Sequence, residues 1–277
     1  MPVDINAAVI SNVRLSEDYN VLTLAAPAIG EQTQPGQFVM VKAALPADSL
    51  LRRPFSVFEV IRDNGRVAAI SIFNKRAGQN TRALYGLEPG ERVACLGPLG
   101  KSFSPTPHDA WMVAGGVGLA PFATLAERLT LSGIKTTLFY GARRAGELFY
   151  LDFFERLGIT LVLSTEDGSR GVRGRITTPL ESALASVPGR DLVMIYGCGP
   201  EPMLEAVARL AAKYRQPCEV SVERVMGCGL GGCYSCVVPV RNGDGGPHFV
   251  RSCLAGPVFD GSQIVWDFHP GGTDAHA

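Results

Sequence analysis

Four cysteines near the C-terminal end have the residue type and the spacing to bind metal. Cys228, Cys233 and Cys236 are separated by four and two residues, and Cys253 follows after sixteen more. Plant-type 2Fe-2S sites use this spacing of four, then two, then a distant fourth thiolate. Glycines fill most of the first interval, and they let backbone N–H groups approach bridging sulfides without obstruction. We therefore predict that these four thiolates hold a 2Fe-2S cluster.

A single tetrahedral zinc ion is the alternative for the same residues. Structural zinc sites normally draw their cysteines as two close pairs with two to four residues inside each pair. Here three thiols share one glycine-rich loop, which favours the cluster over zinc. Cys95 and Cys218 fit no ligand spacing, and we expect them to be ordinary buried small side chains.

Two short motifs in the first third of the chain are suited to a flavin nucleotide. Arg52-Arg53-Pro54-Phe55-Ser56 combines cations, which suit a phosphate, with a hydroxyl that can hydrogen-bond the edge of a flavin ring. Gly78-Gln79-Asn80-Thr81 opens a predicted short helix, whose first N–H groups would face a pyrophosphate. Taken singly, the first also fits a solvated strand edge and the second a capped turn. Their occurrence together in one β-rich segment favours a flavin nucleotide.

Two glycine-containing loops further along are suited to a nicotinamide nucleotide. The loop from Gly115 through Gly116 and Gly118 to Pro121 lies where a buried strand-like run passes into a helical one, and Cys198-Gly199-Pro200 repeats this arrangement. Both loops should open at the carboxyl ends of their strands, where open α/β sheets bind ligands. The alternatives are a tight packing turn for the first loop and a space-filling thiol at position 198.

The elements that must position these motifs fall into three segments. Residues 1–105 contain short β-rich runs (VLTLAAP, QFVMVKAAL, FSVFEVI, RVAAISIFN, RVACLGPLG) and predict an antiparallel FAD-binding barrel with one short helix around residues 80–85. Residues 106–217 alternate strands and helices, which predicts a mainly parallel, NAD-binding α/β sheet. Residues 218–268 hold short β-like pieces (EVSVERV, CVVPV, HFVRSC, QIVWDF) and predict a small 2Fe-2S domain stapled by its cluster.

The composition of the chain limits which partners it can bind and in which cellular compartment it is expected. Lys plus Arg (26) equals Asp plus Glu (26), so there is no net field to gather nucleic acid or anionic lipid. No stretch approaches the roughly 20 apolar residues that span a bilayer, and the N-terminus does not read as a signal peptide. Seven cysteines, an odd number with four clustered, make a poor disulfide set. We therefore expect a cytoplasmic protein with no membrane or nucleic-acid partner.

The motif order RPFS, GQNT, GGVGLAP, GCGPEPM and CGLGGCYSC with a final Cys resembles the ferredoxin-NADP reductase superfamily. Within it, SVERVMGCGLGGCYSC joined to RSCLAGPVF is similar to the electron-transfer subunit of NAD-linked dihydroorotate dehydrogenase. The likeness runs from about residue 5 to residue 267. One departure is that related chains generally have a second glycine and a basic residue where this chain has Gln79-Asn80.

The resemblance implies a set of binding residues. The FAD contacts implied are Arg53, Pro54, Phe55, Ser56, Ile72, Asn74, Gly78, Asn80 and Thr81, the NAD(H) contacts are Gly115, Gly116, Gly118, Pro121, Cys198, Gly199 and Pro200, and the cluster ligands are Cys228, Cys233, Cys236 and Cys253. No side chain is assigned as a catalytic acid or base.

The resemblance also implies a role in pyrimidine biosynthesis. Electrons would pass from the FMN of a separate catalytic subunit through the 2Fe-2S cluster and FAD to NAD⁺, in a heterotetramer. Leu230, Tyr234 and the region of Met226 would form an apolar face for docking that subunit, or would only shield the sulfides.

Three questions stay open at this point. One alternative is a flavin and iron-sulfur subunit of a sulfite reductase, hydrogenase or transhydrogenase, and another is a zinc-stapled nucleotide-binding regulator. Arg143 and Arg144 follow the second strand of the nucleotide segment, where an arginine can meet the 2′-phosphate of NADP. The family resemblance instead favours NAD.

Overall fold

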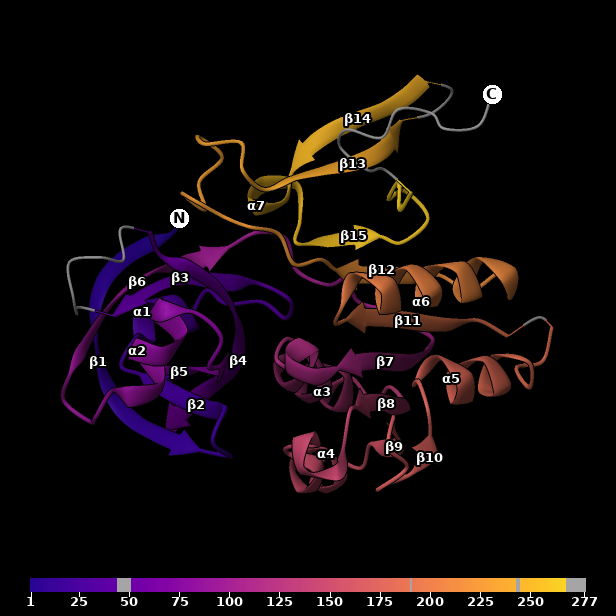
Figure 1. Cartoon of the computed structure of the whole chain (residues 1–277), viewed down its shortest axis with the longest axis horizontal. Coiled ribbons are helices and arrows are strands. Elements are labelled where there is room, and N and C mark those ends of the chain that lie inside the picture. The colour runs from indigo at the N-terminus through magenta and orange to yellow at the C-terminus, as the bar shows by residue number, and fades with distance from the viewer. Residues whose placement is uncertain (44–50, 190, 243–244, 268–277) are drawn as a thin grey trace.

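The computed structural model describes residues 1–43, 51–189, 191–242 and 245–267, and its elements form three regions in chain order. Figure 1 shows the barrel in indigo and purple, the large sheet with its helices beside it, and the C-terminal hairpin above the sheet in yellow. The predicted antiparallel barrel, parallel-sheet domain and small C-terminal region are confirmed. The segment boundaries stay a prediction, and residue 268 lies outside the described residues.

Six strands close into an antiparallel barrel in the order β1-β2-β5-β4-β3-β6. They are β1 (Val3–Arg14), β2 (Tyr19–Leu24), β3 (Phe38–Ala43), β4 (Arg53–Asp63), β5 (Arg66–Lys75) and β6 (Arg92–Leu99), with the helices α1 (Pro27–Gly30) and α2 (Gln79–Gly86). Alternate side chains such as Val39 and Val41 on β3 and Ile70 on β5 fill the barrel. Strand β1 was not among the predicted runs because its Asp and Asn residues have low strand propensity, and pairing with both β2 and β6 stabilises it.

The second region is built on a seven-stranded sheet of order β10-β9-β8-β7-β11-β12-β15, parallel except for β15. Its elements are β7 (Asp109–Gly115), η1 (Gly116–Leu119), α3 (Phe122–Leu131), β8 (Thr136–Ala142), η2 (Ala145–Glu147), α4 (Leu151–Arg156), β9 (Thr160–Thr165), β10 (Val172–Arg173), α5 (Thr177–Leu184), β11 (Val193–Cys198), α6 (Glu201–Lys213), β12 (Cys218–Ser221) and β15 (Val258–Asp260). The chain winds outward from β7 to β10 and then returns to β11 on the other side of β7. The strand order therefore reverses between β7 and β11, the place where such sheets bind ligands.

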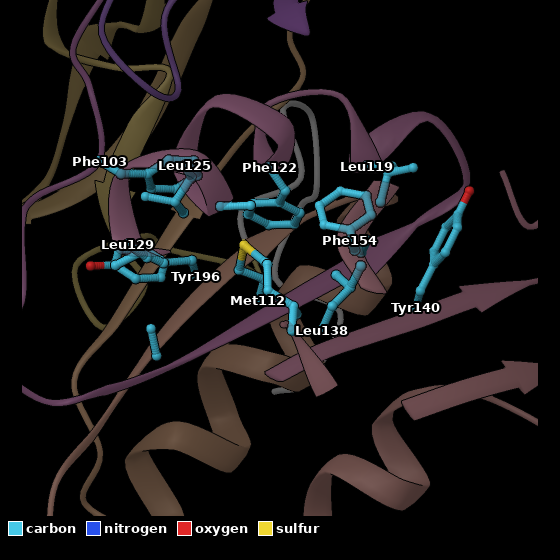
Figure 2. Close-up of a cluster of buried hydrophobic side chains, with 14 of the residues drawn as sticks. Phe103, Met112, Leu119, Phe122, Leu125, Leu129, Leu138, Tyr140, Phe154 and Tyr196 are labelled. Atoms are coloured by element: carbon cyan, nitrogen blue, oxygen red, sulfur yellow. The ribbon is translucent and has the colours of Figure 1, made fainter. Parts of the chain in front are cut away.

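Buried side chains cover both faces of this sheet. Figure 2 shows one face, where Phe122 and Leu125 of α3 and Phe154 of α4 pack over Met112 and Leu138 of the strands. On the other face, residues of α5 and α6 pack against Val113, Phe139 and Ile195. Helices on both sides allow the central strands to be nearly all apolar, as the sequence indicated.

The C-terminal region is a hairpin of β13 (Val237–Asn242) and β14 (Gly245–Arg251) followed by the short helix α7 (Ser252–Ala255). Strands β12 and β15, which also come from residues 218–268, extend the large sheet. The β-like piece expected at QIVWDF is short: Ile264 forms an antiparallel bridge with Val240, and the N–H groups of Arg241 and Val265 donate to the carbonyls of Gln263 and Pro239. Residues 266 and 267 form a turn, and residue 268 lies outside the described residues.

Candidate flavin, nucleotide and cluster sites

The four predicted ligand cysteines lie together as two pairs of thiols. Cys228 neighbours Cys233 and lowers the pKa of its thiol, and Cys236 neighbours Cys253 and raises the pKa of that thiol. Cys236 and Cys253 are buried, whereas Cys233 is exposed at the rim. A 2Fe-2S cluster has two irons, each with two terminal ligands, so two adjacent thiol pairs fit it.

Hydrogen bonds to the sulfurs shape the environment of these thiols. The hydroxyl of Ser235 and backbone N–H groups lower the pKa of Cys233 to about 6, which favours the thiolate that metal requires. Burial, together with the neighbouring Cys236 thiol, raises the pKa of Cys253 to about 12. The N–H of Leu230 donates to Cys228 Sγ at 3.3 Å, and the N–H of Cys253 donates to Cys236 Sγ at 3.5 Å.

Two glycines in the loop between Cys228 and Cys233 have no room for a side chain. Gly229 and Gly231 have φ angles of +72° and +82°, and a Cβ atom would lie 2.6 Å from Met40 Cγ or 2.5 Å from Leu254 Cδ1, respectively. Glycine is needed at both positions. Within the described residues, no three Cys, His, Asp or Glu side chains converge around one point as they would around a single ion.

The cysteine loop rests directly on the barrel. Cys236, Cys253 and Met226 share one buried apolar cluster with Phe38 and Met40 of β3 and with Leu96 and Leu99 of β6. Met226, predicted on an exposed docking face, is thus buried at 4% exposure, because its side chain fills this contact. Leu230 and Tyr234 are exposed, as predicted for that face.

The predicted flavin motif begins strand β4, next to the same part of the barrel. Pro54 pairs with Met40 and Ser56 pairs with Phe38 across β3 and β4. Phe55, the residue between them, packs on the barrel core instead. Pro54 and Ser56 thereby lie on the outer face of the barrel, beside the two β3 side chains that contact Cys236 and Cys253.

The two arginines at the start of this motif differ in their partners. Arg52 forms an ion pair with Asp4 at 2.8 Å. Arg53 is exposed and donates to the carbonyl oxygens of Leu51 and Arg52, and it forms no ion pair with a carboxylate among the described residues. Arg53 is therefore the better placed of the two to meet a phosphate.

The second phosphate motif is the N-terminus of helix α2. The Thr81 hydroxyl accepts hydrogen bonds from the N–H groups of Ala77 and Gly78, and it caps the helix start. Asn80 is buried, and its amide bonds the backbone of Val41 and Ala43 on β3. Val41 in turn pairs with Arg53, so both motifs meet at the same place on the barrel. Side chains of Asn80 and Thr81 serve the fold, and only backbone N–H groups of the first turn remain for a phosphate.

Ile72 and Asn74 lie on β5 with side chains that are fully buried. Ile72 packs in the barrel core, and Asn74 donates to Asn20 Oδ1 at 2.7 Å and to the carbonyl of Thr81 at 3.0 Å. Asn74 Oδ1 has no hydrogen-bond partner among the described residues. These two residues can therefore contact a flavin mainly through their backbone, and the unpaired oxygen is an acceptor at the base of α2.

The two predicted nucleotide loops are packed against each other at the switch point. Gly115 ends β7 and Cys198 ends β11, and these strands are hydrogen-bonded neighbours. A Cβ atom on Gly118 would lie 2.1 Å from the carbonyl oxygen of Cys198, and one on Gly199 would lie 3.1 Å from the Gly115 nitrogen. Pro121 caps α3 and Pro200 caps α6, so both helices begin at this edge. The arrangement suits a pyrophosphate.

Cys198 has a half-buried side chain beside these loops. Burial raises the pKa of Cys198 to about 12 in spite of the hydrogen bond with Ser221, so the thiol is neutral at physiological pH. Arg144, on the same sheet edge, is paired with Glu147 at 3.2 Å. Arg143 is exposed.

An aromatic contact joins the nucleotide loops to the barrel. Tyr19, Phe58 and Phe73 of the barrel form one buried cluster with Ala120 and Ala123, against which Val117 of the glycine loop packs. Phe58 lies two residues after Ser56 on β4. The flavin motif of strand β4 therefore lies near both loops. The cysteine loop packs beside Pro54 and Ser56, and the nucleotide loop packs near Phe58.

Sequence reasoning missed three residues that shape the cluster site. Ser235 bonds Cys233, Met40 supports Gly229, and Arg251 donates to the Gly231 carbonyl at 2.7 Å while its guanidinium lies 4.6 Å from the centre of the Tyr234 ring. Ser235 sits inside the ligand motif and was open to prediction. Met40 and Arg251 carry no local signal, because only the fold brings them to the loop.

Comparison with known families matches the three regions separately. Residues 6–103 match the oxidoreductase FAD-binding domain, residues 112–209 the oxidoreductase NAD-binding domain, and residues 223–265 the iron-sulfur cluster binding domain of dihydroorotate dehydrogenase B. The predicted FAD, NAD and 2Fe-2S cofactors are borne out at the level of these domains. No helix in the described part of the chain is long and apolar enough to cross a membrane.

Solved structures agree with this division. The chain superimposes on the structure titled "Insights into flavin-based electron bifurcation via the NADH-dependent reduced ferredoxin-NADP oxidoreductase structure" with a TM-score of 0.82 and 25% identity, over 95% of this chain and 91% of that one. The ferredoxin reductase in carbazole 1,9a-dioxygenase gives a TM-score of 0.67 at 23% identity, over 78% and 67% of the two chains. Fold and site together define a flavin- and nicotinamide-binding oxidoreductase with an added iron-sulfur domain.

Curated relatives are more specific. The "Dihydroorotate dehydrogenase B (NAD(+)), electron transfer subunit" of Geobacillus kaustophilus is 36% identical over 93% of this chain and 96% of its own length. The protein of the same name from Desulforamulus reducens is 34% identical over 95% and 98%. The chain belongs to this family of electron transfer subunits.

Proposed function

We propose that this chain carries electrons from the FMN of a dihydroorotate dehydrogenase catalytic subunit, through a 2Fe-2S cluster and FAD, to NAD⁺. A nicotinamide exchanges a hydride and a cluster passes single electrons, whereas a flavin does both, so FAD must stand between them. The observation that carries the proposal is the position of β4. Its Pro54 and Ser56 lie beside the side chains that contact Cys236 and Cys253, and its Phe58 packs with the nucleotide loop.

The residues that we propose to hold each group follow from this arrangement. Arg53, Pro54, Phe55 and Ser56, the backbone of Ile72 and Asn74, and the start of α2 from Gly78 through Asn80 and Thr81 would bind FAD. Gly115, Gly116, Gly118, Pro121, Cys198, Gly199 and Pro200 would bind NAD(H), with the pyrophosphate at the two helix N-termini. Cys228, Cys233, Cys236 and Cys253 would bind the cluster. The neutral Cys198 thiol supplies a small uncharged contact beside a nicotinamide ring.

We further propose that the chain works in a heterotetramer with the FMN-containing subunit, in the cytoplasm. Exposed apolar side chains surround the cysteine loop, namely Val225 (82% exposed), Leu230 (55%), Tyr234 (62%) and Leu254 (49%). An apolar patch of this kind suits a protein partner that must approach the cluster closely. Seven free cysteines, four of them clustered, suit a reducing compartment.

Co-purification followed by an activity assay tests this function. The chain alone should oxidise NADH with artificial electron acceptors and should show no dihydroorotate activity. Addition of an FMN-containing dihydroorotate dehydrogenase subunit from the same cell should create NAD-linked oxidation of dihydroorotate. If the chain does not bind that subunit and instead co-purifies with a sulfite reductase or hydrogenase component, it serves as the flavin and iron-sulfur subunit of that other complex. The identity of 36% to the dihydroorotate family, against 25% to the bifurcating oxidoreductase, favours the first outcome.

A further inference from the structure

The hydroxyl group of Ser235 is placed to act on one cluster ligand. Ser235 Oγ lies 3.1 Å from Cys233 Sγ, and it accepts a hydrogen bond of 2.9 Å from the N–H of Gly227. An N–H group can only donate, so the hydroxyl oxygen serves as the acceptor toward Gly227. The single hydroxyl proton is then free to point at the sulfur.

The direction of the bond to sulfur follows from the ligand chemistry. A cysteine that binds iron is a thiolate and has no proton to give, so Cys233 Sγ can only accept. With the cluster in place, Ser235 Oγ–H therefore donates to Cys233 Sγ. The other thiols that receive hydrogen bonds of defined length do so from the backbone, from Leu230 to Cys228 and from Cys253 to Cys236. Ser235 is thus a donor that a side-chain substitution can remove.

We propose that Ser235 raises the reduction potential of the 2Fe-2S cluster by donating its hydroxyl proton to the Cys233 thiolate. The proposal rests on the proposed function, since it requires the cluster. Reduction adds negative charge to the iron and its sulfur ligands, so a donor to sulfur stabilises the reduced form more than the oxidised form. Hydrogen bonds to the sulfurs are among the features that set cluster potentials. Ser235 is a positioning and tuning residue here, because it acts through Cys233.

Solvent exposure limits the size of the effect. Both Ser235 and Cys233 are exposed, so water competes for the sulfur in the isolated chain. A net hydrogen bond of ordinary strength changes an equilibrium constant by about two- to tenfold. We expect Ser235→Ala to lower the equilibrium constant for one-electron reduction of the cluster by that factor, with tenfold corresponding to about 59 mV.

An anaerobic redox titration followed by electron paramagnetic resonance measures this shift directly, on the purified chain with its FAD and cluster. Ser235→Thr keeps the hydroxyl and should keep the potential. Ser262→Ala removes a hydroxyl that donates to Asp260 Oδ1 at 2.7 Å in a turn outside the cysteine loop, and it should also leave the potential unchanged. The potential of the FAD should be the same in all four proteins.

The outcomes separate this proposal from a purely structural role. A loop support lost in Ser235→Ala would lower the iron content per FAD while the remaining clusters kept the wild-type potential, and that result would overturn the proposal. An unchanged potential at full iron content would overturn it too. If the wild-type chain itself gave no signal of a reducible cluster, the proposed function would fail instead.

Discussion

At the residue scale, the exposed Cys233 of the cysteine loop differs in its surroundings from the two buried thiols that fit no ligand spacing. Cys95 is fully buried inside the barrel, where burial raises the pKa of its thiol to about 12, and Cys218 is buried in the sheet. Cys233 instead has a lowered pKa and stands next to Cys228 at the rim of the chain. Sequence spacing alone distinguishes the four predicted ligands from Cys95 and Cys218, because ligand thiols on one loop must follow a fixed spacing whereas core thiols need not.

Replacement of Cys233 by Ser should remove the cluster and leave most of the FAD. The ligand is lost from the exposed rim, whereas the proposed FAD residues lie on a barrel with its own core. Iron, acid-labile sulfide and flavin per chain are the quantities to measure, with Cys95→Ala as the control that keeps its iron. A wild-type protein with one zinc per chain and no sulfide would contradict the assignment of the four ligands.

The preference between NADH and NADPH should also depend on single residues, namely Arg143, Arg144 and Glu147. We expect NADH to bleach the flavin faster than NADPH, because the Glu147 carboxylate already engages Arg144 and would repel a 2′-phosphate. Stopped-flow reduction with both nucleotides checks this. Glu147→Gln should narrow the preference by freeing Arg144. Faster reduction by NADPH in the wild-type chain would show that Arg143 outweighs the Glu147 carboxylate.

Residues that no local pattern marks complete the site. Met40 meets Gly229 and Arg251 meets Gly231, although these partners are far apart in sequence. An isolated Met in a strand is normally a core residue, and the cysteine loop was the unforeseen layer that buries it. Conversely, Met226 was predicted on the surface because its neighbours in sequence are cluster ligands, and it is buried against the barrel.

At the element scale, the alternation of strands and helices between residues 106 and 217 was predictable because each strand is an apolar run that ends in glycine or a polar turn. The pairing of β12 and β15 with the large sheet was not predictable. The run EVSVERV was predicted to be β-like and contains most of β12, whereas Val258–Asp260 is too short to signal a strand. That β12 and β15 extend the large sheet depends on the edge of that sheet being available to pair with them. The sequence therefore predicted three regions without predicting that the third shares a sheet with the second.

The contact between the two nucleotide loops predicts the effect of Gly118→Ala. The new methyl group would lie 2.1 Å from the Cys198 carbonyl oxygen, so the ends of β7 and β11 must move apart. We expect a cost of about 1–3 kcal/mol in stability and at least a tenfold loss in the efficiency of flavin reduction by NADH. Thermal unfolding and steady-state kinetics measure the two effects. Gly189→Ala has open space around its new methyl group and is the matched control. Wild-type kinetics in Gly118→Ala would remove this loop from the nucleotide site.

The contact between α3 and strand β4 of the barrel predicts that the stability of the protein depends on pH. Burial raises the pKa of Glu127 on α3, and the charge of Glu59 on β4 raises it further, while burial also raises the pKa of Glu59. A raised folded-state pKa contributes stability at low pH that is lost as pH rises through that pKa. Glu127→Gln should therefore raise the melting temperature at pH 7, and the gain should vanish below the ordinary carboxyl pKa of 4.5.

Melting curves of the wild type and Glu127→Gln, recorded across a range of pH, test this predicted gain. Glu155→Gln, on the exposed side of α4, is the control for removal of a surface charge. A gain in melting temperature that is equal at every pH would contradict the electrostatic explanation. A lower melting temperature of Glu127→Gln at pH 7 would contradict it as well.

At the scale of the whole molecule, the barrel is the hub on which the other two regions pack. The cysteine loop packs on β3 and β6, and the glycine loop of the nucleotide region packs near Phe58 of β4, so a flavin on β4 would be flanked by both. Both contacts are made by buried apolar side chains rather than by surface ion pairs, so we expect the packing of the three regions to be insensitive to salt.

We propose that NADH, FAD and the cluster form one connected path for electrons in this chain. Anaerobic addition of NADH, with absorbance and electron paramagnetic resonance recorded on the same sample, tests it most directly. The path predicts that the flavin bleaches and that the signal of a reduced 2Fe-2S cluster then appears, with both changes slowed in Gly118→Ala. Bleaching of the flavin with a fully loaded cluster that stays oxidised, or no bleaching at all, would contradict it.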